Sequence, residues 1–331
     1  MRSHMVVAPL AISLVLAGVP VSVAGWTPAT GAHPDLVSPY QPYELKLISF
    51  YPAPNRPAGV LLRVGINGGR PLRMLLDSGA EFVVIGAKTA RSLGLSSGSE
   101  MDLVGLGTRP AKVGIAESVH VGPVSFRNCR VAIVEGQVIE GADGVIPLSL
   151  FSDFLLRLDL PEKVLRLIPY PREEGPAAPP SRGATKHDVL LVAAVLNGQR
   201  NGYVLVDTGA SCSAVSREVA RTLSGFQVVP EVRLAAGTGA AIGQRISSTA
   251  HFVIAERDLI ADEVVTLDLS DLSLHYSVKV IGVLGFPALA SYVLTIDYRN
   301  GRVKIEPLQS VSARELNRRR NAKPPVSLAF R

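Results

Sequence analysis

The amino-acid sequence predicts a mostly β protein that is built from two related lobes with short helices. Its 331 residues include 30 glycines and 24 prolines, and this composition favours turns and short strands over long helices. The apolar runs are short, and strands do not alternate with long helical stretches as they do in parallel α/β sheets. The third observation is an internal repeat. We therefore expect two β-rich halves of similar architecture.

The repeat is clearest where residues 61–95 align with residues 190–225. Each copy contains an apolar strand, an Asn-Gly pair, a second apolar strand and a short loop, which reads "DSGA" after Leu76 and "DTGA" after Val206. Asn-Gly favours a tight hairpin turn because both residues accept a positive φ. A short strand and a short helix are predicted after the loop in both copies.

The two copies also correspond further along the chain. Asp77 and Asp207 are 130 residues apart, whereas Asp159 and Asp297 are 138 apart, so the second copy is eight residues longer. We expect the additional residues within 256–280. Each copy continues with a glycine-rich hairpin, a glycine-containing apolar turn and a closing hairpin, at 103–114, 143–151 and 156–169 in the first and at 234–243, 281–289 and 294–307 in the second.

The chain divides into six predicted segments. They are an export signal at 1–24, an N-terminal extension at 25–54, a first lobe at 55–170, a linker at 171–186, a second lobe at 187–307 and a basic, disordered tail at 308–331. Residues 6–24 carry no charge and end in Ser22-Val23-Ala24, which is typical of a cleaved signal. Their length also nearly suits a retained membrane anchor. We expect an exported protein, periplasmic or secreted, that contacts a membrane only if this segment is retained.

The net charge of +6 does not indicate a nucleic-acid partner. Six basic residues and one acid lie in the tail after Pro307, and Arg2 adds one more basic residue, so the rest of the chain is close to neutral. The histidines are scattered without metal-binding spacing, and we expect neither a metal nor a cofactor. The two cysteines, Cys129 and Cys212, leave open whether they form a disulfide or remain buried thiols.

The two repeated loops suit acid-base chemistry if they face one another. A lone aspartate has a pKa of roughly 3.9, but two carboxyl groups in contact share a proton and their pKa values separate. One then accepts a proton from water while the other donates to a carbonyl oxygen, and an amide bond is hydrolysed. Asp77 and Asp207 supply the carboxyl groups. The residues that follow each aspartate are small, so the two loops can approach closely and brace one another. They are Ser78, Gly79, Thr208 and Gly209.

These loops resemble those of retropepsin-like aspartic proteases, in the form in which bacteria carry both lobes in one polypeptide. Asp-Ser/Thr-Gly-Ala after an apolar strand is that family's signature, and Gly282-Val283-Leu284-Gly285 resembles its second marker. The resemblance covers about residues 55–307 and implies two pseudo-symmetric β-barrel lobes with Asp77 and Asp207 as the catalytic dyad. It further implies loop-bracing roles for Ser78, Gly79, Thr208 and Gly209, and flaps over the cleft at Gly105, Gly107, Thr108, Gly237, Thr238 and Gly239.

Two features depart from the family pattern. Pro147 stands where a glycine is expected in the second marker of the first copy, and proline fixes φ and lacks a backbone donor. Neither flap stretch contains the tyrosine that the pepsin branch uses at its flap, which fits the retroviral-like branch better.

From these residues we expect a monomeric aspartic endopeptidase that cuts extended, mostly apolar peptide or protein segments with a water activated between Asp77 and Asp207. The alternative is a retropepsin-like fold that has lost catalysis and binds extended peptides by strand addition. The intact aspartate pair favours the enzyme, while Pro147 favours the alternative.

Overall fold

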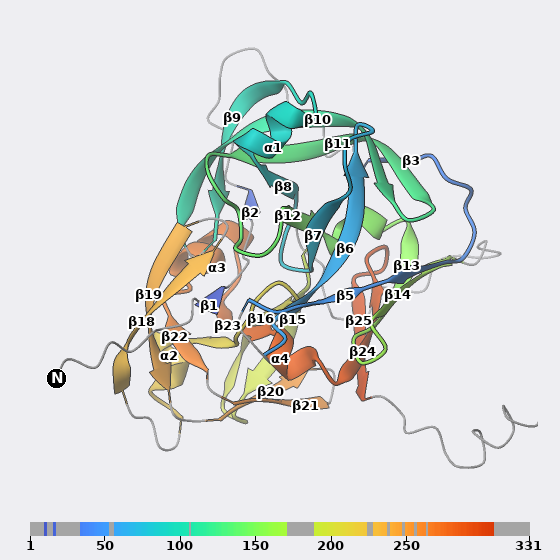
Figure 1. The fold of residues 1–331 in the computed structure, drawn as a ribbon. Coiled ribbons are helices and arrows are strands. Elements are labelled where there is room, and N and C mark those ends of the chain that lie inside the picture. The colour runs from blue at the N-terminus through green and yellow to red at the C-terminus, as the bar shows by residue number, and fades with distance from the viewer. Residues whose placement is uncertain are drawn as a thin grey trace, which may run out of the picture.

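A computed structural model shows a mostly β chain with two large sheets and a smaller third sheet (Figure 1), which confirms the predicted fold class. The helices are short: α1 (Ala87–Ser92), η1 (Leu148–Phe151, a 3-10 helix), α2 (Arg217–Ala220), α3 (Ser270–Tyr276) and α4 (Phe286–Leu289). None of the described helices is long and apolar enough to span a bilayer.

The structure describes residues 10–11, 16–17, 34–52, 56–105, 107–170, 189–223, 228–236, 239–246, 249–254, 257–262 and 264–307. The predicted linker at 171–186, the tail at 308–331 and most of the predicted export signal lie outside these residues.

The first lobe is built on one sheet with the strand order β2-β9-β10-β11-β8-β12-β7-β6-β5, and β3 pairs with β11 beside this path. Strands β8 and β12 are buried along their whole length, as expected for continuous apolar segments at the centre of a sheet. The strands are β2 (Leu16–Ala17), β3 (Asp35–Leu36), β5 (Ile48–Phe50), β6 (Gly59–Ile66), β7 (Leu72–Asp77), β8 (Val83–Gly86), β9 (Ser97–Val104), β10 (Thr108–Val121), β11 (Val124–Val134) and β12 (Gly144–Pro147).

The second lobe repeats this arrangement in the order β1-β18-β19-β22-β17-β23-β16-β15-β20-β21. Strand β10 of the first lobe corresponds to two shorter strands of the second, β19 and β20, and β11 corresponds to β21 and β22. The pairing partners of these strands show the correspondence. The strands are β1 (Leu10–Ala11), β15 (Leu191–Leu196), β16 (Arg200–Asp207), β17 (Ala214–Ser216), β18 (Val228–Ala236), β19 (Gly239–Ile246), β20 (Ala250–Ile254), β21 (Arg257–Ala261), β22 (Val265–Leu267) and β23 (Val280–Gly285).

Matching hairpin turns lead into both aspartate loops. Asn67 and Gly68 have φ values of 49° and 70° between β6 and β7, and Asn197 and Gly198 have 47° and 66° between β15 and β16. Two consecutive positive φ angles are those of a tight hairpin turn that Asn-Gly favours. The structure therefore confirms the turns predicted from the repeat.

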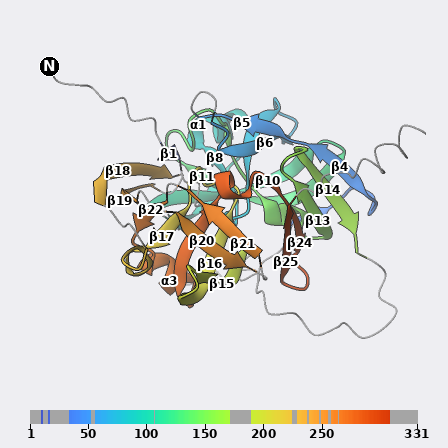
Figure 2. The same ribbon diagram turned by 90° about the horizontal axis from the view of Figure 1, so that it is seen from below.

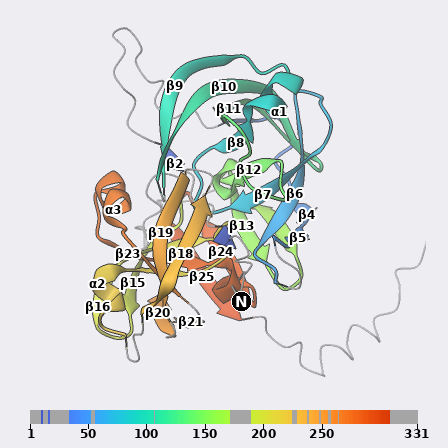
Figure 3. The ribbon, with the colours of Figure 1, turned by 60° about the vertical axis from the view of Figure 1, so that its left-hand side comes forward.

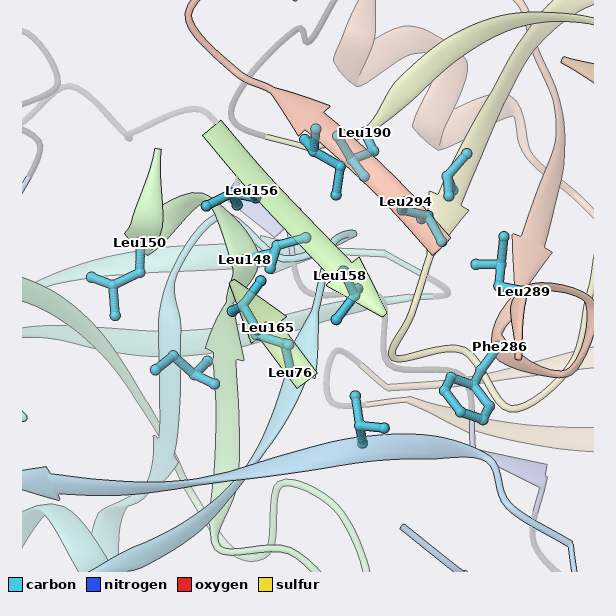
Figure 4. Packing of buried hydrophobic residues seen from close by; sticks show 14 of the residues in the cluster. Leu76, Leu148, Leu150, Leu156, Leu158, Leu165, Leu190, Phe286, Leu289 and Leu294 are labelled. Carbon is cyan, nitrogen blue, oxygen red and sulfur yellow. The ribbon is translucent and has the colours of Figure 1, made fainter. Parts of the chain in front are cut away.

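A third sheet, with the order β25-β24-β13-β14-β4, joins the two lobes (Figure 2). Its strands are β4 (Tyr43–Lys46), β13 (Phe154–Asp159), β14 (Val164–Pro169), β24 (Tyr292–Asp297) and β25 (Arg302–Pro307). Strand β13 of the first lobe pairs with β24 of the second, and Leu158 lies opposite Leu294. Both leucines are fully buried in a cluster that draws on both lobes (Figure 4). Each such side chain stabilises the lobe interface by about 1.5–3 kcal/mol.

Two hairpins face each other on one side of the molecule (Figure 3). One is β9–β10 of the first lobe and the other is β18–β19 of the second, which confirms the two glycine-rich hairpins predicted from the repeat. The short N-terminal strands lie on their edges: β1 pairs with β18 in parallel, and β2 pairs with β9 in antiparallel orientation. Residues 10–11 and 16–17 therefore pair with one hairpin each.

Candidate active site

Asp77 and Asp207 each end a central strand of their lobe, β7 and β16, and both are fully buried. The residues before them, Leu76 and Val206, are also fully buried. Apolar side chains thus fix each strand in the core up to the residue at which the polar loop begins. A carboxyl group at the end of such a strand is held more rigidly than one on a free loop.

The loops are braced by reciprocal hydrogen bonds between the lobes. The hydroxyl of Ser78 donates to the carbonyl oxygen of Val206 (2.7 Å) and accepts from the backbone N–H of Thr208 (3.0 Å). The hydroxyl of Thr208 donates to the carbonyl oxygen of Leu76 (2.9 Å) and accepts from the backbone N–H of Ser78 (3.1 Å). All four bonds are buried, so each loop depends on the other for its position.

The two carboxyl groups differ in the donors that they receive. Oδ1 of Asp77 accepts the N–H of Gly79 at 2.7 Å. Oδ1 of Asp207 accepts two N–H groups, from Gly209 at 2.8 Å and from Ala210 at 3.0 Å. The Oδ2 atoms of both aspartates are buried and accept no hydrogen bond from the described residues. These two oxygens are therefore the ones that can bind a water molecule or a substrate.

Burial raises the pKa of both carboxyl groups above the ordinary aspartate value. The negative charge of Asp207 raises the pKa of Asp77 further. The backbone donors of Gly209 and Ala210 oppose the rise for Asp207 because they stabilise its charged form. A proton shared by the pair is thus held mainly by Asp77, and Asp207 carries the negative charge.

The predicted flap residues lie in or next to the hairpin turns, as far as they are described. Gly105 and Gly107 form the turn between β9 and β10, where the N–H of Gly105 donates to the carbonyl oxygen of Gly107 (2.8 Å). Thr108 begins β10, and Gly239 begins β19. The remaining two, Gly237 and Thr238, lie outside the described residues.

Comparison with known proteins agrees with this geometry. Residues 62–150, which contain the Asp77 loop and the first flap, match the family model described as aspartyl protease. The match covers the first lobe, which is therefore similar to that family. A solved aspartic proteinase from Irpex lacteus is similar in fold, with a TM-score of 0.52, 11% sequence identity, and coverage of 82% of this chain and 99% of that one. No curated protein matches the chain.

The two lobes differ in the strand behind each aspartate. Gly285 lies opposite Asp207 in the strand pairing, and its N–H donates to the hydroxyl of Ser213 (3.0 Å). Pro147 lies opposite Asp77 and has no N–H to donate. The position that matches Ser213 in the first lobe is Val83, which offers no acceptor. Proline therefore leaves no polar group unsatisfied here.

Sequence reasoning missed a cluster beside the dyad. Nε2 of His275, on α3, lies 3.8 Å from Oε1 of Glu81, and only 14% and 11% of the two side chains is exposed. The ring of His275 packs edge-on against that of Tyr276, with centroids 4.9 Å apart. Burial raises the pKa of Tyr276 well above its ordinary value, and the charge of Glu81 raises it further. The charges of Asp207 and Asp77 also raise the pKa of Tyr276.

No local pattern in the sequence pointed to this cluster, because α3 falls in the segment of the second copy that aligns with nothing in the first. Among the described residues, no three histidine, cysteine, aspartate or glutamate side chains are grouped so that they could hold a metal ion. Cys129 and Cys212 are both buried and form no disulfide in the structure, which decides between the two alternatives left open above.

Proposed function

We propose that this chain is an aspartic endopeptidase that hydrolyses peptide bonds with a water molecule activated between Asp77 and Asp207. The observation that supports it most strongly is the pair of buried carboxyl groups on loops that brace one another through Ser78 and Thr208. Two carboxyl groups so placed share one proton, which is the protonation state that acid-base hydrolysis of an amide requires.

The different donors of the two aspartates assign their roles. The carboxylate of Asp207 accepts a proton from the water while the water oxygen attacks the carbonyl carbon of the scissile bond. Asp77 donates its proton to the carbonyl oxygen, and a tetrahedral intermediate forms. When the intermediate collapses, the C–N bond breaks, the proton on Asp207 passes to the leaving nitrogen, and Asp77 regains a proton from the intermediate. One water molecule is consumed, and the pair returns to its starting state.

The flap edges support an extended peptide as the substrate. Strands β1 and β2, whose sequences Leu10-Ala11 and Leu16-Ala17 are apolar, pair with β18 and β9 through backbone hydrogen bonds. This is recognition by strand addition, in which main-chain bonds hold an extended chain of varied sequence. We extend the proposal to a monomer that is exported and acts on mostly apolar segments.

A peptide-library assay tests the proposal. The purified chain from Gly25 onward is incubated with the library from acidic to mildly basic pH, beside the variants Asp77→Asn and Asp153→Asn. The chain and the control Asp153→Asn, whose aspartate is exposed, are expected to cleave the same peptides, and Asp77→Asn none. A wild-type chain that binds these peptides without cutting them at any pH would favour the alternative, a fold that only binds.

A further inference from the structure

Helix α3 is an addition to the second lobe. Strand pairing makes Val84 equivalent to Ala214, so that Ala132 corresponds to Val265 and Val145 to Val283. In the first lobe Val145 follows Ala132 by 13 residues, whereas in the second lobe Val283 follows Val265 by 18 residues. The first lobe forms turns in this interval, whereas the second lobe forms α3. The sequence predicts the eight additional residues of the second copy within 256–280, and the structure places five of them between Val265 and Val283.

The helix is fixed to the strand behind Asp207. The hydroxyl of Ser273 donates to the carbonyl oxygen of Leu269 (2.8 Å) and accepts the N–H of Val280, the first residue of β23, at 3.0 Å. Leu272 and Tyr276 are buried on its inner side. The last turn of α3, which carries His275, therefore has a set position relative to the second lobe.

That last turn contacts the aspartate loop of the other lobe. Glu81 follows Asp77 by four residues, and its Oε1 atom is buried and accepts no hydrogen bond from the described residues. Nε2 of His275 is the polar group that faces it, at 3.8 Å. A buried polar atom is costly when no polar group lies near it. The histidine therefore stabilises Glu81 in the place where the structure holds it.

The surroundings of this contact belong to the active site. Tyr276 packs in one apolar cluster with Ala210 and Cys212, which follow Asp207 in its loop. Val104, at the end of the flap strand β9, packs against the same cluster. Glu81 faces His275, and the ring of His275 packs against that of Tyr276.

We propose that His275 and Glu81 are positioning residues, which form a second connection between the lobes and hold the Asp77 loop in register with Asp207. The proposal rests on the proposed function, since it concerns the geometry of that dyad. The bonds between Ser78 and Thr208 fix the base of the two loops, and the contact of Glu81 with His275 fixes the end of the Asp77 loop.

Kinetics on the full chain test the proposal with an apolar peptide that the wild type cleaves. His275→Gln is expected to lower kcat about 10-fold with KM changed less than about twofold, since misplaced catalytic groups slow the chemical step. His275→Lys, which places a cation opposite Glu81, is expected to recover most of the loss. The double variant with Glu81→Gln is expected to be no slower than the slower single variant. The control is His251→Gln, which breaks an exposed pair with Asp258 and leaves kcat unchanged.

An unchanged kcat in His275→Gln, a His275→Lys variant as slow as His275→Gln, or losses that multiply in the double variant would overturn the proposal. Hydrogen exchange provides a readout that needs no activity. The Gly79 amide, which donates to Asp77, is expected to exchange at least about fivefold faster in His275→Gln than in the wild type. If the wild type cleaves no peptide, the proposed function fails, and equal exchange at Gly79 would still contradict the positioning role.

Discussion

Gly79, in the loop of the first lobe, lies directly against the carboxyl group of Asp207 in the second. A side-chain carbon at position 79 would be 2.9 Å from Cγ of Asp207 and 3.0 Å from Oδ2, which is closer than two such atoms approach. The carboxyl group cannot move away easily, because Gly209 and Ala210 hold its other oxygen. The closeness of the two loops therefore requires glycine at this position.

Gly79→Ala is expected to lower kcat/KM about 100-fold, because the added methyl group displaces the Asp207 carboxyl group. Peptide cleavage by the purified variant measures this. Gly65→Ala is the matched control, since a side-chain carbon there meets only His120 at an ordinary 3.8 Å. Activity of Gly79→Ala equal to that of Gly65→Ala would contradict the described contact.

Thr208→Val removes the bracing hydroxyl and keeps the shape of the side chain. The carbonyl of Leu76 loses its donor and the N–H of Ser78 loses its acceptor, so the free energy of unfolding is expected to fall by about 2–3 kcal/mol. Denaturant unfolding measures the change. Thr295→Val, at a half-buried position of β24, serves as the control and is expected to be near neutral. Equal stability of the two variants would argue against the bracing.

The dyad makes stability depend on pH. The pKa of Asp77 in the folded chain is raised by burial and by the charge of Asp207, so between the ordinary aspartate value and this higher pKa the folded state binds more protons than the unfolded state. The free energy of unfolding therefore falls as pH rises through this interval. Asp77→Asn, which stays neutral, is expected to lose less stability than the wild type over the same interval. Thermal unfolding at a series of pH values checks this, and parallel curves for the two proteins would contradict it.

Removal of residues 1–24 is expected to improve peptide binding. In the full chain, β1 and β2 occupy backbone groups of β18 and β9 on the flap edges, and a peptide must displace them. The chain that begins at Gly25 is therefore expected to show a KM several-fold lower than the full chain, with a similar kcat. Equal KM values for the two chains would show that this pairing does not compete with substrate.

The sequence was sufficient to predict the features that the repeat carries. The Asn-Gly turns at residues 67 and 197, the two aspartate loops and both hairpins arise from local patterns that occur twice, and the repeat itself indicates that two lobes face each other. The contact of Glu81 with His275 could not be predicted in this way. The two residues are 194 positions apart, and His275 lies in an insertion without a counterpart in the first lobe.

Two other features also depend on tertiary structure. Two long strands of the first lobe are each replaced by two shorter strands in the second. The sequence offered no turn motif from which this difference could be predicted. The fit of Pro147 depends on Val83, which lies across the sheet and offers no acceptor for an N–H group. Sequence alone identified Pro147 as a departure from the family pattern, and only its neighbours show that the missing N–H deprives no side-chain acceptor of a donor.

The dependence of kcat/KM on pH tests the central claim most directly, since one proton shared by Asp77 and Asp207 must be present for both to act. We predict a bell-shaped profile, with activity lost on the acidic side when the pair holds two protons and on the basic side when it holds none. A profile with a single ionisation that persists in Asp207→Asn would contradict the account.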